Sequence, residues 1–282
     1  SAAGRALPEV SLAALHTEGT MSALTRVYYE GDVLFDGMLR DIECAKRSIR
    51  LESYIFASDI VGRQFVDAVV RCVARGISVH LRADHAGSWS VLSRADIDRM
   101  RAAGVRFEWS RPWSPRRPLK INRRNHRKLL VVDGSVAYVG GFNVHAAGSL
   151  RAMGPARWRD THVRFVGDSA AAAATVFDCY LDVPPDWLPP VTGSPWLLPN
   201  RSRACRHRLR CVLNDTLRAA RSRIWATTPY FVPDSLTQRL LCEAAVRGVE
   251  VWLLVPGKSD VPLAQWAARA AYSRLLSCGV RI

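Results

Sequence analysis

The chain has 282 residues, of which 49% are hydrophobic, so it can bury the core of one large domain or of two smaller ones. No apolar run reaches the length of a membrane span, and residues 1–19 lack the charged start and the apolar stretch of a secretory signal peptide. The seven cysteines are scattered without paired spacing, which argues against a disulfide framework or a zinc site and is typical of reduced thiols in the cytosol.

The chain is strongly basic, with a formal net charge of +15 and a pI near 10.2. This charge predicts attraction to a polyanion, either nucleic acid or an anionic membrane surface. No acidic residue lies between Glu108 and Asp133, six of the fourteen residues 111–124 are basic, and Trp109 and Trp113 lie in or beside this run. Indoles among basic residues suit a lipid headgroup interface and also suit single-stranded nucleic acid. Charge alone therefore leaves both partners open.

Helix and strand patterns alternate along the first half of the chain, after a loose lead-in expected at residues 1–26. Apolar spacing predicts helices at residues 32–45, 62–75 and 95–103, and apolar runs predict strands at residues 48–56, 77–83 and 105–109. Glu52 lies inside the first strand, and the sequence leaves open whether its carboxylate faces solvent. Asp84 and His85 follow the second strand, at a position where open sheets bind ligands. The alternation predicts an α/β sandwich.

A short hairpin follows the basic run. Residues 129–132 and 136–139 are apolar and predicted to be strands, and the Asp-Gly pair at 133–134 is a strong turn signal between them. Because side chains alternate between the two faces of a strand, His126 and Lys128 are expected to project side by side at the entrance to this hairpin.

The groups around this hairpin fit attack on a phosphodiester. A neutral His126 can act as a nucleophile, and Lys128 and Asn143 can donate hydrogen bonds to phosphoryl oxygens. Gly140 and Gly141 allow a backbone or a ligand to approach closely. The chain has four Lys against thirty-six Arg, so a lysine at this position favours a need for a compact ammonium. The alternative is an ordinary hairpin that carries a surface His and Lys.

The second half of the chain repeats the pattern of the first. A strand is predicted at residues 160–166 and an alanine-rich helix at 170–181, followed by six prolines within residues 184–199 that predict a linker or a long loop. The repeat is carried by three pairs of segments: 45–49 with 220–224, 74–79 with 246–251, and 104–107 with 279–282. Their offsets of 172 to 175 residues predict two copies of one unit, the second of which stops before a counterpart of His126.

The motif itself resembles a known family. The pattern His126-x-Lys128-x4-Asp133-x6-Gly140-Gly141-x-Asn143 is similar to the HxKxxxxD-x6-GSxN signature of the phospholipase D superfamily, with Gly141 where the family usually has serine. Residues 159–164, 228–234 and 255–260 are similar to segments of bacterial cardiolipin synthases. The resemblance covers roughly residues 27–282 and is strongest to cardiolipin synthases that lack N-terminal membrane spans.

The resemblance implies a phospholipase D-like αβα sandwich, α/β in class, with two pseudo-repeated units. Residues 27–183 would form the first unit with the HxKxxxxD motif, residues 184–199 a proline-rich linker, and residues 200–282 the start of a second, incomplete unit. In the family a second histidine, from the second unit, protonates the leaving alcohol. The 282 residues by themselves are therefore expected to be inactive.

The resemblance also implies an activity: a phosphatidyltransferase that makes cardiolipin from phosphatidylglycerol through a phosphohistidine at His126. Lys128 and Asn143 would hold the phosphoryl oxygens beside the two glycines, Gly140 and Gly141. No metal and no organic cofactor are implied.

Two carboxylates complete the expected site. Asp160 would accept a hydrogen bond from His126 and orient it. The alternative for Asp160 is an ion pair with Arg157 or Arg159 at the strand edge. Asp133, in the turn, is expected to brace the hairpin and Lys128 without touching substrate.

The expected partners are an anionic phospholipid membrane and phosphatidylglycerol, at the cytoplasmic side of a bacterial inner membrane, and the oligomeric state stays open. Two alternatives remain: a phospholipase D-like phosphodiesterase or nuclease, and a non-catalytic basic module that binds membrane or nucleic acid. The segments outside the motif that are similar to cardiolipin synthases favour a lipid substrate.

Overall fold

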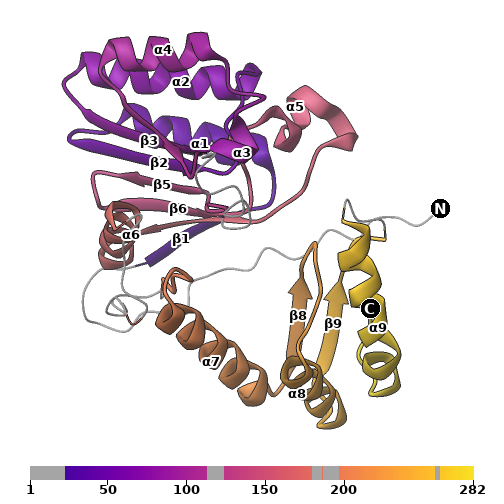
Figure 1. The fold of residues 1–282 in the computed structure, drawn as a ribbon. Helices are drawn as coiled ribbons and strands as arrows, with labels where there is room; N and C mark the ends of the chain where they lie inside the picture. The colour runs from indigo at the N-terminus through magenta and orange to yellow at the C-terminus, as the bar shows by residue number, and fades with distance from the viewer. Residues whose placement is uncertain (1–22, 113–123, 180–185, 187–196, 258–260) are drawn as a thin grey trace. The chain divides into compact units, whose positions relative to one another are not determined.

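The structure is a computed structural model that describes residues 23–112, 124–179, 186, 197–257 and 261–282. The chain forms two compact units, the first with the described residues from 23 to 179 and the second with those from 198 to 282 (Figure 1). Most of the basic run 111–124 and most of the proline-rich stretch lie outside the described residues. None of the helices in the described ranges is long and apolar enough to cross a membrane.

A seven-stranded sheet forms the centre of the first unit, in the order β1-β7-β6-β5-β2-β3-β4. Its strands are β1 (Ala23–Tyr28), β2 (Ser48–Ser53), β3 (Ser78–Asp84), β4 (Arg106–Ser110), β5 (Leu129–Val132), β6 (Val136–Gly140) and β7 (His162–Val166). The strands β2, β3 and β4 run parallel, and each of β5, β6, β7 and β1 pairs antiparallel with its neighbour on the β2 side. The carboxyl ends of β2, β3 and β4 therefore lie at the same edge of the sheet as the start of β5, and we call this the motif edge.

Helices cover both faces of this sheet. The longer ones on one face are α1 (Gly31–Glu43), α2 (Ile60–Ala74) and α4 (Arg94–Ala103), and α6 (Asp168–Asp178) packs on the other (Figure 1). Short helical turns occupy loops at the motif edge: α3 (His85–Ser88), η2 (Ala146–Gly148), α5 (Leu150–Met153) and η3 (Gly154–Ala156). The predicted αβα sandwich is confirmed.

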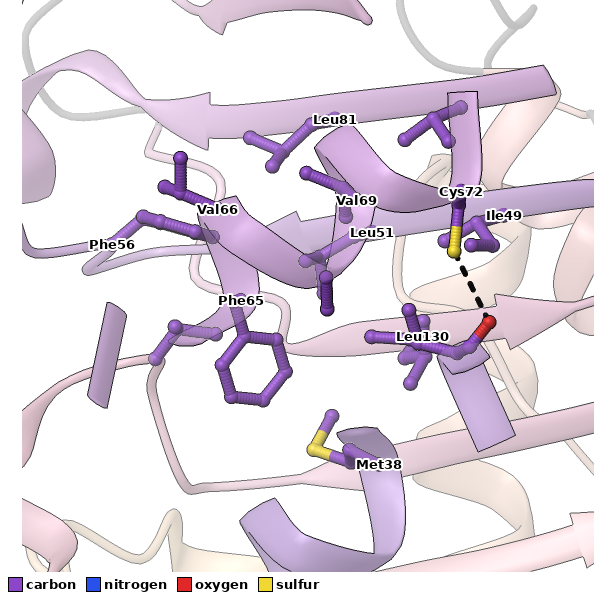
Figure 2. Packing of buried hydrophobic residues seen from close by; sticks show 14 of the residues in the cluster. Met38, Ile49, Leu51, Phe56, Phe65, Val66, Val69, Cys72, Leu81 and Leu130 are labelled. Carbon is purple, nitrogen blue, oxygen red and sulfur yellow. Dashed lines mark hydrogen bonds between the residues drawn. The ribbon is translucent and has the colours of Figure 1, made fainter. Parts of the chain in front are cut away.

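The main core lies between the sheet and α2. Phe65, Val66, Val69 and Cys72 follow helical spacing along one face of α2 and are fully buried near strand residues such as Leu81 (Figure 2). The Cys72 thiol donates a hydrogen bond of 3.3 Å to the carbonyl of Ile42 in α1, which links the two helices.

The strand β5 is buried on both faces because its side chains alternate between the two cores. Leu130 and Val132 belong to the core under α1 and α2, whereas Leu129 and Val131 pack with Phe177 of α6. Covering both faces explains why this strand reads as a continuous apolar run rather than an alternating one.

Two boundary predictions need correction. The loose lead-in expected at residues 1–26 is wrong for its last part, because Ala23–Tyr28 forms β1 and pairs with β7; Thr25 Oγ1 donates to the carbonyl of Arg164, 139 residues away. The strand predicted at 48–56 ends at Ser53, because the backbone N–H of Ile55 donates to the side chain of Asn143 at 2.9 Å.

The second unit repeats the order of elements. It contains α7 (Arg203–Ala219), β8 (Arg223–Thr227), α8 (Ser235–Val246), β9 (Glu250–Leu254) and α9 (Pro262–Ser277). The strands β8 and β9 run parallel, and Arg281 forms a parallel bridge with Trp252 of β9. Helix, strand, helix, strand, helix and the start of a strand thus follow the same order as α1 to β4 in the first unit.

A buried carboxylate ties the motif segment to the sheet. Glu52 is fully buried, so its carboxylate does not face solvent. One of its oxygens accepts a hydrogen bond of 2.9 Å from Arg82, and the other lies 2.9 Å from Nε of Arg127 in an ion pair. The two guanidinium groups also donate to the carbonyls of Phe177 and Val176 near the end of α6. Arg127 is therefore held on the α6 face, which leaves its neighbours in the motif to face the other way.

We expect Glu52→Gln to lower the free energy of unfolding of the first unit by about 3 kcal/mol or more, because it leaves two guanidinium groups without their shared counter-ion in a buried place. Urea unfolding followed by circular dichroism measures the change. Glu43→Gln is the matched control. Glu43 also bridges two arginines, Arg71 and Arg75, but at the surface, where we expect about 1 kcal/mol or less. Equal losses in the two variants would contradict this prediction.

Candidate active site

His126 and Lys128 lie side by side, as the alternation of side chains predicts. The ammonium nitrogen of Lys128 lies 3.1 Å and 3.3 Å from the two ring nitrogens of His126 and donates a hydrogen bond of 2.9 Å to the His126 carbonyl. His126 is exposed, whereas Lys128 is 5% exposed. An accessible imidazole thus lies over a buried cation at the motif edge.

Tyr54 forms one wall of this pair. It follows β2 directly, and its ring centroid lies 4.5 Å from that of His126. The Lys128 ammonium lies 5.1 Å from the same phenol ring, within the range of a cation–π interaction. Tyr54 is not among the site residues predicted from the sequence. The signal available was its position immediately after a strand that pairs with β5.

Asp84 holds the backbone of the motif segment. It is fully buried at the end of β3, and one carboxylate oxygen accepts a hydrogen bond of 2.8 Å from the backbone N–H of Asn125. The other oxygen accepts from the backbone N–H groups of Ala86 and Gly87 and caps α3. One carboxylate therefore fixes both the residue before His126 and the loop beside it. Its place at a strand end was the only sign of this in the sequence.

Asp160 lies next to the pair, in space that Gly141 leaves open. A Cβ atom on Gly141 would overlap the Asp160 carboxylate, so the glycine found in place of the family's serine makes room for it. Among the described residues Asp160 forms no hydrogen bond with His126; its carboxylate accepts one of 2.7 Å from the backbone N–H of Thr161. Its negative charge nevertheless acts on both His126 and Lys128.

Gly140 ends β6 and Asn143 lies in the loop that follows it, and both support the site. The side-chain oxygen of Asn143 accepts the hydrogen bond from Ile55, and this fixes the amide so that its NH₂ group points away from that backbone. A Cβ atom on Gly140 would overlap the carbonyl of Thr161 and the His162 side chain. Only glycine therefore fits at this position of the β6–β7 pair.

Asp133 lies at the other end of β5, away from Lys128. Its carboxylate accepts hydrogen bonds from the backbone N–H groups of Lys46, Arg47 and Ser48, at 2.9, 2.7 and 2.9 Å. It therefore braces the hairpin against the start of β2, as expected. The expected contact with Lys128 is wrong, because Lys128 precedes β5 and Asp133 follows it.

A second histidine, His162, lies buried behind the pair. It is fully buried, and its two ring nitrogens have no hydrogen-bond partner among the described residues. Burial, reinforced by the Lys128 charge, lowers its pKa to about 3, so His162 is neutral near pH 7. It pairs with Gly140 across β6 and β7, and its ring packs against that glycine.

The environment lowers the pKa values of both members of the pair. Burial lowers the pKa of Lys128 from its ordinary 10.5 to about 8, against the opposing attraction of Asp160 and Asp84. Partial desolvation and the Lys128 charge lower the pKa of His126 below 6.5. Near pH 7 the site therefore combines a neutral imidazole, which is the nucleophilic form, with an ammonium that can neutralise an oxyanion.

Comparisons with known proteins identify the family of the chain. The family described as "Cardiolipin synthase, PLD-like domain" matches residues 38–153 and 213–282. The chain is 31% identical to a probable cardiolipin synthase of Bacillus subtilis, over 96% of this chain and 57% of that protein. It is 33% identical to a cardiolipin synthase of Geobacillus kaustophilus, over 93% of this chain and 55% of that protein. The chain spans little more than half the length of these curated relatives.

Among solved structures, a phosphatidylserine synthase from Haemophilus influenzae superposes with a TM-score of 0.59 at 13% identity, covering 88% of this chain and 67% of that one. At this identity the likeness establishes the fold alone. Together with the family match over both units and the motif geometry, it leads to one assignment: the chain belongs to the phospholipase D-like family of the cardiolipin synthases.

Proposed function

We propose that the protein is a phosphatidyltransferase that makes cardiolipin from phosphatidylglycerol, with His126 as the nucleophile. The observation that carries the proposal is the neutral, exposed imidazole of His126 beside the buried ammonium of Lys128. The named relatives, cardiolipin synthases over most of this chain, support a phosphatidyl group as the one transferred.

The reaction would run in two displacements. A ring nitrogen of His126 attacks the phosphorus of phosphatidylglycerol; the N–P bond forms, the P–O bond to the glycerol headgroup breaks, and the departing oxygen takes a proton from a general acid. A hydroxyl of a second phosphatidylglycerol then attacks the phosphorus of the phosphohistidine; the new P–O bond forms, the N–P bond breaks, and the proton of the hydroxyl passes to the group that served as the general acid. This step releases cardiolipin and restores the free imidazole.

The remaining groups have distinct tasks in this scheme. Lys128 and the NH₂ group of Asn143 stabilise the charge that builds on the phosphoryl oxygens. Asp160 acts on His126 through its charge and, once substrate binds, through the hydrogen bond that the family resemblance implies. Asp84 is a positioning residue, since it touches the backbone of Asn125 and not the reacting atoms. Asp133 contributes the rigidity of the hairpin.

The proposed setting is the cytoplasmic face of a bacterial inner membrane, where the enzyme would bind peripherally to anionic phospholipid. The net charge of +15 supports an anionic surface, and the dispersed free cysteines support a reducing compartment. Attack on nucleic acid would use the same chemistry. Release of glycerol from phosphatidylglycerol vesicles, compared with nicking of plasmid DNA, distinguishes the two substrates.

His126→Ala should abolish phosphatidyl transfer by the active, intact protein, because it removes the nucleophile that forms the covalent intermediate in the proposed scheme. Its thermal melting curve should stay nearly unchanged, since the side chain is exposed. The measurement is cardiolipin formation from phosphatidylglycerol vesicles. Appreciable turnover by the variant would rule out His126 as the nucleophile.

The rate of transfer should fall as the pH rises through about 8, because Lys128 then loses the proton that its charge-stabilising role requires. It should also fall on the acid side below pH 6.5, where His126 becomes protonated. A pH profile of kcat measures both limbs. Lys128→Arg keeps its charge throughout and should lose the alkaline limb even if its rate is lower. An unchanged alkaline limb in that variant would assign it to another group, such as the general acid.

Replacing four arginines of the basic run, Arg116, Arg117, Arg123 and Arg124, with Gln should weaken binding to phosphatidylglycerol vesicles at low salt. Each basic residue near an anionic surface contributes about 1 kcal/mol, and salt screens the effect. Sedimentation with vesicles measures it. Unchanged binding by the variant at low salt would place the electrostatic contact elsewhere on the protein.

A further inference from the structure

The exposed large hydrophobic side chains of the first unit lie at one edge of its sheet. Among its described residues they are Tyr29, Val33, Ile60, Trp89, Val91, Leu150, Met153 and Trp158. Each lies in a segment that leaves or enters the motif edge: after β1, after β2, after β3, or between β6 and β7. The same edge holds His126 and Lys128.

The opposite edge has a different character. Its connections at residues 44–47, 75–77, 104–105 and 133–135 carry basic, acidic and small residues, and their two large apolar residues, Ile77 and Val105, are buried. None of the exposed large hydrophobics in the described part of the first unit lies there. Scattered exposed apolar residues are normal on any protein, but a set confined to one edge marks an interaction surface.

The two indoles of this set are presented by well-anchored segments. Trp89 is 68% exposed and directly follows α3, which is held by the Asp84 cap and by the hydrogen bond from Ser88 to the Tyr54 carbonyl. Trp158 is 58% exposed, and its backbone N–H donates to the carbonyl of Ala147 at 2.6 Å. Such anchoring reduces the entropy lost when these side chains enter another phase.

Charge around Trp89 selects the kind of partner. A shallow hollow of about 390 Å³ beside it is lined by Trp109, Leu92 and Ile97, and by the arginines Arg94 and Arg101 with Asp98. An apolar floor with guanidinium groups at its rim suits a phosphate headgroup with its glycerol and first methylenes. Tryptophan concentrates at this depth of a bilayer, between headgroups and acyl chains.

We propose that the motif edge is the surface on which the protein lies against an anionic phospholipid bilayer, with Trp89 and Trp158 inserted at the level of the headgroups. The inference rests on the proposed function in one respect: the substrate phosphorus lies at that depth, so it reaches His126 without leaving the membrane. A protein partner is the less suitable occupant, because the hollow beside Trp89 is lined by Arg94 and Arg101, whose guanidinium groups suit the phosphate of a lipid headgroup.

Partitioning onto vesicles at two salt concentrations tests the surface. At about 1 M salt the Debye length falls to about 3 Å, so the binding that remains is chiefly apolar. The probe is a vesicle of phosphatidylglycerol and phosphatidylcholine, and the protein is the full chain. We expect wild type to keep measurable binding at high salt and Trp89→Ser with Trp158→Ser to lower it about tenfold or more.

A matched control distinguishes the loss of a tryptophan at the motif edge from the loss of a tryptophan elsewhere on the protein. Trp266, in α9 of the second unit, is 66% exposed, nearly as much as Trp89, so Trp266→Ser removes the same chemistry elsewhere. We expect Trp266→Ser to bind like wild type and Trp89→Ser alone to bind less tightly. Far-ultraviolet circular dichroism and thermal melting should be nearly unchanged in all variants, since each side chain is exposed.

The outcomes are distinct. High-salt binding by the double variant that equals wild type overturns the proposal, and so does an equal loss in Trp266→Ser or an absence of vesicle binding by wild type. Cleavage of a water-soluble, short-chain phosphatidylglycerol by the intact enzyme tests the proposed function separately, because that substrate needs no membrane. Failure there with the expected binding pattern leaves the surface in place and removes the function.

Discussion

One buried carboxylate, Glu52, supports the part of the structure on which the chemistry depends. It accepts from Arg82 and pairs with Arg127, and both arginines also reach the end of α6. The motif residues before β5 lie outside any strand ladder, so backbone pairing does not hold them in place. Two contacts hold them instead: the ion pair of Arg127 with Glu52 on the α6 face of the sheet, and the hydrogen bond from the backbone N–H of Asn125 to Asp84. A buried ion pair of this kind is costly to break, and its evident role is to fix geometry.

The same anchoring accounts for the electrostatics of the site. Holding Lys128 at 5% exposure strips its ammonium of water and lowers its pKa to about 8. Desolvation, reinforced by the nearby Lys128 charge, lowers the pKa values of His126 and His162 and keeps both neutral near pH 7. A neutral nucleophile next to a desolvated cation is the arrangement that attack on a phosphodiester needs. The attraction between the cation and the phosphoryl oxygens increases as negative charge develops on them in the transition state. Asp84 and Asp160 limit the effect and keep Lys128 charged near pH 7.

The motif edge carries both the exposed imidazole of His126 and the exposed large apolar side chains of the first unit. This follows from topology: parallel β2, β3 and β4 end where antiparallel β5 begins, so the long loops collect there and the short turns collect opposite. Long loops tolerate both functional residues and unpaired apolar ones. A substrate that remains in a bilayer makes the coincidence useful, since docking and catalysis then share one orientation.

The sequence by itself determined what short-range patterns determine. Helical spacing, apolar runs and the Asp-Gly turn located the longer helices of the first unit, both hairpin strands and the α/β class. The placement of His126, Lys128 and Asn143 around the hairpin predicted the phosphodiester chemistry. Only the tertiary structure decided what depends on distant pairing. β1 joins a strand more than a hundred residues later, Asp84 meets Asn125, Tyr54 lies against His126, Glu52 turns inward, and Asp133 braces β2 and not Lys128. Those contacts join segments that are far apart in the sequence, so no local pattern predicts them. They depend on which strands lie next to one another in the sheet.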